Sequence, residues 1–537
     1  MSMRNASPSA LRSLAVAVAL ACSSMAVNAA PDSNAKALLD SKCQACHMPG
    51  EDGALNRIDQ SRRTPEGWDM TIGRMVAAHG VRLTSEERQT LVKYLADTHG
   101  LAPEEVADRR YLLERDFALV ETPDDKKLAE TCARCHSYGR IALQRRTEED
   151  WRKLAHFHVG QFPTIEIQAS GRDRNWWDIA SQEMPKTLSR LYPYQSEAWS
   201  QWLAHKKADV AGAWRVVGHR PGWGAYEGTA SIEKDGADRY RLNMQLNYAN
   251  GKQESAQGQA IVYTGYEWRA TVKQGDDEIV QVFTLSADGQ TLEGRWHKVG
   301  VDSMGGELRA VRNGAGSPGQ VLMVEPSYVK AGTTQRISLY GSNLSGSVDL
   351  GSDLQVVKVL EQSPEKVVVE VRAGAGVADG MRAVSVGKAR LEQGLALYKQ
   401  VDFLKIEPRH AMANVGGNGG VRPKIPVQFE SVAYAYGPDG KKGTDDDLRL
   451  GYMPATWSVA NLNANAEMMR DVEFAGTLQD NGLFIPGDAG PNPKRKYGTN
   501  NAGELKVTAV VSDEGRQVKA SKPLIVTVQR WNDPPIR

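Results

Sequence analysis

The sequence predicts a multidomain fold in which an α-helical domain is followed by three antiparallel all-β domains. Its 537 residues are enough for several domains, since one domain typically takes about 100 to 200 residues. Two observations divide the chain. A helical pattern that contains an internal repeat extends to about residue 207, and short runs that alternate apolar and polar residues follow it.

The charges of the chain are nearly balanced, with 66 lysines and arginines against 65 aspartates and glutamates. A protein that binds a polyanion normally has a clear basic excess. The composition therefore gives no support for nucleic acid as a partner.

Residues 1–30 have the pattern of a secretory signal peptide. Two arginines precede the apolar run 14–21, and small residues near Ala30 follow it. The alternative is a lipoprotein signal with a lipid on Cys22, but the residue three positions earlier is Ala19 where leucine is usual. No other apolar run approaches the roughly 20 residues that span a bilayer. We therefore expect an exported chain without a membrane span.

Two motifs of the form C-x-x-C-H lie in the helical region, from residues 31 to 207. They consist of Cys43, Cys46 and His47, and of Cys132, Cys135 and His136. Two cysteines at this spacing can bond the vinyl groups of a haem, while the following histidine presents its imidazole to the iron. A zinc site also uses C-x-x-C, but zinc needs four ligands and no further cysteine lies near either motif. We predict two covalently bound haem c groups and no disulfide.

The two motifs belong to two copies of one repeat. Arg-Thr-Pro-Glu-Gly-Trp68 follows the first motif and Arg-Thr-Glu-Glu-Asp-Trp151 follows the second, and in each phrase threonine suits the N-cap of a helix. Each copy reads as haem helix, middle helix and closing helix, which resembles the small cytochrome c fold. The tryptophans are 83 residues apart, whereas Tyr94 and Trp202 of the closing helices are 108 apart. The second copy therefore carries a 25-residue insertion, roughly within residues 160–192.

The repeat also predicts the sixth ligand of each iron. Seven residues after the repeat tryptophans stand Met75 and His158, at the same place in each copy. We therefore predict the ligand pairs His47/Met75 for the first haem and His136/His158 for the second. Because methionine favours reduced iron and a second imidazole favours oxidised iron, the first haem should have the higher potential.

Other ligands for the irons stay open. Met184 precedes a proline inside the insertion and is the strongest rival for the second iron, and His156 is another. His79 and His99 lie close to Met75 in the sequence.

Residues 208–313 predict an antiparallel barrel. Alternate residues of the run 240–246 are apolar, so they fall on one face of a strand, and Asn250-Gly251 is typical of a hairpin turn. A linker rich in glycine follows at residues 313–319. The lengths and patterns of 320–400 and 401–537 predict two immunoglobulin-like sandwiches.

The β region contains one acidic loop, from Asp439 to Asp447. Its carboxylates could hold calcium, but they lack the ordered spacing and bidentate glutamate of an EF-hand. A solvated hairpin tip is the alternative interpretation.

A signal peptide, two cytochrome-like repeats of which the second is enlarged, and three β domains form an uncommon order. This order, with the two C-x-x-C-H motifs and their Arg-Thr-Trp phrases, resembles the large α subunit of quinohemoprotein amine dehydrogenase along the whole chain. The resemblance implies a periplasmic heterotrimer that oxidises primary amines, with a propeller-like β subunit. A small γ subunit would carry a cysteine tryptophylquinone.

In such an assembly this chain would contribute the haems and no catalytic residue. The resemblance implies that the haems carry electrons from the quinone to a soluble acceptor, an azurin-like copper protein or a cytochrome c. The alternatives are a dihaem subunit of another periplasmic oxidoreductase, a peroxidase-type haem enzyme and a binding protein that displays β modules. A peroxidase needs an open iron position, and both repeats offer a sixth ligand.

Overall fold

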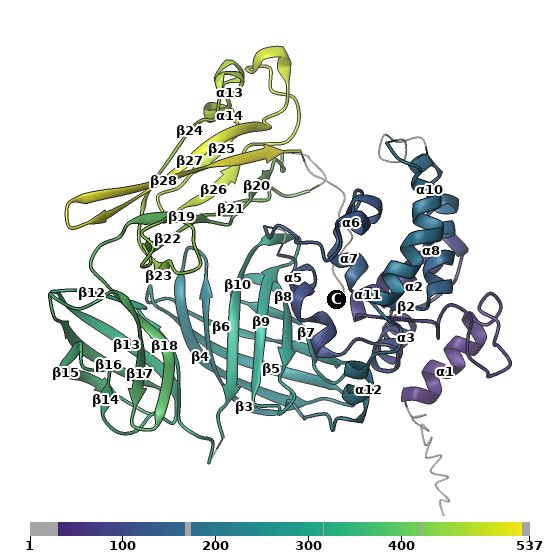
Figure 1. Cartoon of the computed structure of the whole chain (residues 1–537), viewed down its shortest axis with the longest axis horizontal. Coiled ribbons are helices and arrows are strands. Elements are labelled where there is room, and N and C mark those ends of the chain that lie inside the picture. Colours follow the sequence, from purple (N-terminus) through teal and green to yellow (C-terminus); the bar gives the residue numbers. More distant parts are fainter. Residues whose placement is uncertain (1–30, 117, 167–172, 315, 419–421, 529–537) are drawn as a thin grey trace, which may run out of the picture.

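The computed structural model describes residues 31–116, 118–166, 173–314, 316–418 and 422–528 (Figure 1). The predicted signal peptide, residues 1–30, lies outside these ranges, as do the last nine residues of the predicted second sandwich. None of the helices in these ranges is long and apolar enough to cross a membrane.

The region before the barrel is mainly helical. The first repeat contains α1 (Pro31–Lys42), α2 (Pro65–His79) and α3 (Ser85–Thr98), and the second contains α6 (Lys126–Cys132), α8 (Glu148–Gln161) and α12 (Glu197–Ala204). Short helices between or within them are α4 (Pro103–Val106), η1 (Ala107–Arg109), α5 (Arg110–Leu113), α7 (Gly139–Ala142) and η2 (Pro163–Glu166). The insertion of the second copy forms α10 (Trp176–Asp178), a π-helical turn η3 (Ile179–Glu183) and α11 (Met184–Leu191).

The predicted helix starts of the two repeats are confirmed. The Thr64 hydroxyl accepts a hydrogen bond from the Gly67 amide, and Thr147 accepts one from Asp150, each at 3.2 Å. These hydroxyls satisfy amides that have no partner within their own helix. Trp68 and Trp151 follow at the same place in each helix and are buried in the cores of their repeats.

The two repeats are joined by a small sheet that the sequence did not predict. Strands β1 (Ser61–Arg63) and β2 (Gln144–Arg146) pair antiparallel, with Arg62 opposite Arg145. These two arginines are 83 residues apart, which is the offset between the repeat tryptophans. Equivalent residues of the repeats therefore face each other, so a local twofold relation connects the two copies.

The second domain is an eight-stranded closed barrel, and the prediction of a barrel is confirmed. Its order is β10-β3-β4-β5-β6-β7-β8-β9. The strands are β3 (Gly212–Arg220), β4 (Gly224–Lys234), β5 (Arg239–Tyr248), β6 (Gln253–Tyr263), β7 (Glu267–Gln274), β8 (Asp277–Leu285), β9 (Thr291–Lys298) and β10 (Val301–Arg312). The alternate apolar residues of β5 point inward and are buried, as their spacing indicated.

Side chains fill the barrel, and the second repeat closes one end of it. Trp199 and Trp202 of α12 belong to the same buried cluster as the tryptophans inside the barrel. The Trp202 indole donates a hydrogen bond to the carbonyl of Thr264 at 2.8 Å. The closing helix of the second copy thus anchors the helical region to the barrel.

The third domain has two four-stranded sheets around one apolar core. Sheet β11-β13-β16-β15 contains Gln320–Glu325, Thr334–Ser342, Lys366–Ala373 and Leu354–Gln362, in that order. Sheet β12-β18-β17-β14 contains Tyr328–Lys330, Ala389–Tyr398, Gly380–Val386 and Val348–Asp349. The two sheets are compatible with a sandwich, and the immunoglobulin-like assignment stays a prediction.

The fourth domain has three sheets around its own core. They are β19-β22-β23 (Phe403–Glu407, Glu430–Ala435, Leu448–Tyr452), β20-β28-β27-β24 (Ala411–Asn414, Arg516–Thr527, Gly503–Asp513, Thr456–Asn461) and β21-β26-β25 (Val427–Gln428, Leu483–Pro486, Gly476–Leu478). Short helices α13 (Ala464–Met469), α14 (Asp471–Phe474) and η4 (Lys496–Gly498) connect strands.

The prediction of purely antiparallel β domains is wrong at two places. β12 pairs parallel with β18, and β20 pairs parallel with β28. Each pair joins a short strand to one far along the chain. Two parallel neighbouring strands need such a long connection between them. The alternation of apolar and polar residues within a strand does not show which other strand will pair with it.

The outer face of the barrel packs against the helical region. Val280 and Val282 of β8 share a buried cluster with Leu113 and Leu143. Arg269 of β7 forms an ion pair with Glu66 of α2 at 2.6 Å. The helical region therefore lies against the outside of the barrel at β7 to β9 (Figure 1).

Candidate haem sites

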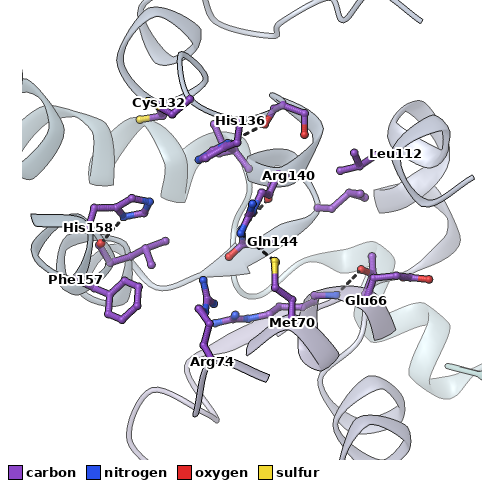
Figure 2. A pocket seen from close by; sticks show the side chains of 18 of the residues that line it. Glu66, Met70, Arg74, Leu112, Cys132, His136, Arg140, Gln144, Phe157 and His158 are labelled. Carbon is purple, nitrogen blue, oxygen red and sulfur yellow. Dashed lines mark hydrogen bonds between the residues drawn. The ribbon is translucent and has the colours of Figure 1, made fainter. Parts of the chain in front are cut away.

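A cavity of about 1200 Å³ lies where the two repeats meet the barrel. Its walls come from α2 of the first repeat, from the second C-x-x-C-H motif and α8, from the insertion, and from β8 and β9 of the barrel (Figure 2). Cys132, Cys135, His136 and His158 all line it. The structure therefore brings the predicted site residues of the second haem together around one cavity.

The ring of His136 is held by a backbone hydrogen bond at one of its two nitrogens. Its Nδ1 lies 3.0 Å from the carbonyl oxygen of Ser137. A carbonyl only accepts hydrogen bonds, so the proton is on Nδ1 and Nε2 keeps its lone pair. This partner to the second ring nitrogen is typical of histidines that bind metals.

His158 has the same arrangement, two turns after Trp151 on α8. Its Nδ1 lies 2.8 Å from the carbonyl oxygen of Leu154. Burial lowers the pKa of both His136 and His158 below the ordinary value, which favours the neutral imidazole that binds a metal. Both rings line the cavity, and in Figure 2 both lie near Cys132.

The structure separates the two rival ligands of the second iron. Met184 lines the cavity and is buried in the core of the second repeat. His156 is exposed, packs edge-to-face on Trp177 and is not among the cavity residues. The choice between His158 and Met184 stays a prediction, and His156 has no geometric support.

The first motif lies at the end of α1 and outside this cavity. The His47 amide donates to the carbonyl of Cys43 at 2.9 Å, so the motif continues as a helical turn. His47 Nδ1 lies 2.9 Å from the carbonyl oxygen of Asn56, which again leaves Nε2 for a metal. Cys43 packs against the cluster of apolar residues that contains Trp68.

Met75 is half-buried and lies two turns after Trp68 on α2, so the two side chains fall on the same side of the helix. It does not line the large cavity. Of its rivals, His79 is exposed. His99 has both ring nitrogens engaged, with the Thr98 hydroxyl at 2.8 Å and the Asp59 carboxylate at 2.9 Å. Met75 remains the predicted sixth ligand of the first iron.

The insertion supplies one wall of the cavity, a role that the sequence analysis missed. Trp176, Ala180, Met184 and Leu188 all line it at a spacing of four residues, across the π-helical turn. The Trp176 indole donates to the Thr131 carbonyl at 3.1 Å, next to the haem motif. The spacing of four was visible in the sequence and could have indicated a continuous helical face.

Several buried polar atoms on the cavity wall lack partners. Among the described residues, none forms a hydrogen bond with Arg63 Nε, Trp151 Nε1 or His297 Nε2. An unsatisfied buried group costs about 1–3 kcal/mol. A bound group with polar substituents would offset this cost, so the cavity fits haem, which has both an apolar ring and carboxylates. The sequence analysis did not identify Arg63 or His297 as site residues.

The acidic loop in the fourth domain uses its carboxylates for hydrogen bonds within the loop, and calcium binding there stays a prediction. Its carboxylates accept hydrogen bonds within the loop, such as Asp439 from the Lys441 amide at 2.8 Å and Asp447 from the Gly443 amide at 2.6 Å. Nowhere in the described ranges do three or more histidine, cysteine or acidic side chains gather closely enough to hold a metal ion.

The fold and the cavity define a multidomain haem protein, with a haem-binding domain followed by several all-β domains. Comparison with family models agrees along the chain. The haem-binding model of the quinohemoprotein amine dehydrogenase alpha subunit matches residues 33–199, and the models of its domains II, III and IV match 207–313, 318–399 and 404–536. The chain belongs to the family of quinohemoprotein amine dehydrogenase alpha subunits.

Other comparisons add little. A search of curated proteins gave no match. Among solved structures, a redesigned beta barrel, mFAP1, bound to DFHBI has 12% identity and a TM-score of 0.18, with 19% of this chain and 94% of that chain covered. The Bacteroides ovatus glucan-utilisation protein SGBP-B has 14% identity and a TM-score of 0.17, with 59% and 60% covered. TM-scores this low support no conclusion about fold or function.

Proposed function

We propose that this chain is the dihaem electron-transfer subunit of a periplasmic amine dehydrogenase. Electrons would come from a cysteine tryptophylquinone in a small partner subunit and leave to a soluble copper protein or cytochrome c. Haem supplies the one-electron chemistry when bound, because its iron changes between ferric and ferrous states. The family membership and the two C-x-x-C-H motifs support this role.

The residues of this chain would hold the two haems and tune them. Cys43 and Cys46 would bond one haem, and Cys132 and Cys135 the other. His47 and Met75 would ligate the first iron, and His136 and His158 the second. The apolar wall from the barrel and the insertion would exclude water from the second site. A drier site strengthens the effect of nearby charges on the iron.

One observation supports the proposal most: α2 contributes residues on different faces to the two predicted sites. Trp68 packs in the core of the first repeat and Met75 follows it by two helical turns, whereas Met70 and Arg74 of the same helix line the second cavity. A helix with its side chains is only about 10–12 Å across. The two cofactors would therefore be separated by a single helix, which suits transfer of electrons from one haem to the other.

Rapid mixing of the intact heterotrimer with substrate tests this function. On rapid mixing with a primary amine, both haems should become reduced, and a soluble acceptor should then reoxidise them. The chain purified alone should accept electrons from a chemical reductant but should not turn over n-butylamine. Amine turnover by the single chain would contradict the proposal. Turnover of hydrogen peroxide would support the peroxidase alternative.

A further inference from the structure

Arg63 is a buried arginine whose charge has no carboxylate partner. It is 5% exposed, and within the described ranges no acidic side chain forms an ion pair with it; the carboxylate of the same cluster, Asp150, pairs with Arg57 and Arg146. Its guanidinium donates only to the hydroxyls of Thr71 and Ser61, and its Nε has no partner among those residues. A buried charge without a counterion is costly. The structure therefore needs an anion near Arg63.

The surroundings of Arg63 add to this need. The charges that act on it most are those of Arg146, Arg74, Asp150 and Arg57. Three of the four are positive, and the single carboxylate, Asp150, is already shared by Arg146 and Arg57. Burial and the neighbouring arginines lower the pKa of Arg63 well below its ordinary value. Arg63 and Arg146 are thus two buried guanidiniums beside one buried carboxylate, Asp150, and that carboxylate pairs with Arg146 and not with Arg63.

Trp151 supplies a second donor in the same place. It is 3% exposed, lines the cavity, and its indole N–H has no partner within the described part of the chain. The guanidinium of Arg146 lies over its ring, 5.4 Å from the centroid, which connects Trp151 to the arginine cluster. The equivalent Trp68 differs, because its N–H donates to the His99 carbonyl at 2.9 Å. Only the second repeat leaves this donor for a ligand.

We propose that Arg63 and Trp151 form a carboxylate seat that receives a propionate of the haem bound to Cys132 and Cys135. Arg63 comes from the first repeat and Trp151 from the second, and β1–β2 brings the two repeats together at this point. A planar guanidinium and an indole N–H both donate to a carboxylate, and such charge-assisted hydrogen bonds are strong. The first repeat therefore completes the cofactor site of the second. This inference rests on the proposed function in one respect, because it requires a haem bound at the second C-x-x-C-H motif.

Redox titration of the intact complex tests the seat. In the wild type, the seat holds the propionate ionised, so the potential of the second haem should be insensitive to pH near neutrality. Arg63→Gln removes a positive charge that favours ferrous iron, so it should lower that potential. The propionate should then titrate, and the potential should rise as pH falls. Trp151→Phe keeps the ring but removes the donor, so it should give the same pH dependence with a smaller shift.

Two matched variants control for general effects. Trp68→Phe removes an indole N–H that is already paired, and Arg152→Gln removes a partly exposed guanidinium from the same helix as Trp151. Neither should introduce pH dependence at the second haem. Arg63→Lys, which keeps the charge, should shift the potential less than Arg63→Gln and provides a variant if the latter does not fold.

The outcomes separate the seat from the proposed function. If both haems are present but Arg63→Gln and Trp151→Phe leave the second potential and its pH dependence unchanged, the seat is contradicted. If the wild-type chain binds no haem at the second motif, the proposed function itself is contradicted.

Discussion

Arg62 and Arg145 face each other across the β1–β2 pair and hold the same carboxylate. Arg62 donates to both oxygens of Glu105, at 2.8 and 2.9 Å, and Arg145 donates through Nε at 3.0 Å. All three side chains are less than a tenth exposed. The two arginines are equivalent residues of the two repeats. Glu105 therefore forms ion pairs with both copies at the place where they are related by the local twofold.

Glu105→Gln should strongly destabilise the helical domain. It would leave two buried guanidiniums without their counterion, and breaking a buried pair in this way costs about 3–5 kcal/mol. The urea midpoint of the helical domain, followed by haem absorbance, should fall accordingly. Glu104→Gln is the control, because that neighbour is exposed. A midpoint for Glu105→Gln equal to that of the control would show that the clamp contributes little.

The same carboxylate predicts a dependence of stability on pH. Burial alone would raise the pKa of Glu105, but the hydrogen bonds and charges of Arg62 and Arg145 outweigh it and lower the pKa. A carboxyl whose pKa is lower in the folded than in the unfolded protein stabilises the folded state at pH values above its unfolded pKa, which is about 4.3 for glutamate. This stabilisation disappears as the pH falls through the pKa of the folded state. The difference in unfolding free energy between wild type and Glu105→Gln should be constant near neutrality and shrink below about pH 4. A constant difference at all pH values would refute this account.

Replacement of methionines tests the ligand of the first iron. Met75→Ala should abolish any methionine-to-iron charge-transfer band in the oxidised protein and lower the potential of one haem, because the sulfur that favoured ferrous iron is lost. Met184→Ala should leave the band unchanged. If Met184→Ala removes the band and Met75→Ala does not, methionine ligates the second iron and the pairing must be reversed.

Replacement of histidines tests the second iron. His158→Ala should leave the second haem high-spin in its electron paramagnetic resonance spectrum, because one imidazole is lost. His156→Ala is the matched control, since that ring is exposed and packs on Trp177 outside the cavity. A low-spin second haem in His158→Ala would identify another residue, with Met184 the first to examine.

The features that the sequence predicted correctly depend on local signals. Thr64 and Thr147 cap their helices because a hydroxyl beside free amides is a short-range effect. The inward face of β5 follows from strict alternation. The register of the repeat also singled out His158, which lines the cavity. Ligation of the irons by His158 and Met75 stays a prediction.

The features that the sequence did not predict depend on contacts between distant segments. β1 and β2 are three residues each and exist because the repeats pair with each other, so no local pattern indicated them. The parallel pairing of β12 with β18 and of β20 with β28 was not predicted for the same reason, because each pair joins segments that are distant in the sequence. The arginine cluster around Arg63 forms only when the two repeats meet, although Arg63, Arg146 and Asp150 stand in the phrases that define the repeat.

Counting the haems of the mature chain tests the central claim most directly. Denaturing electrophoresis with a haem stain and intact mass should show two haem additions that survive unfolding. Replacing Cys43 and Cys46 with serine should leave one, and replacing Cys132 and Cys135 should leave the other. Two additions in the wild type and one in each variant are the result that this account predicts. One addition or none in the wild type would contradict it.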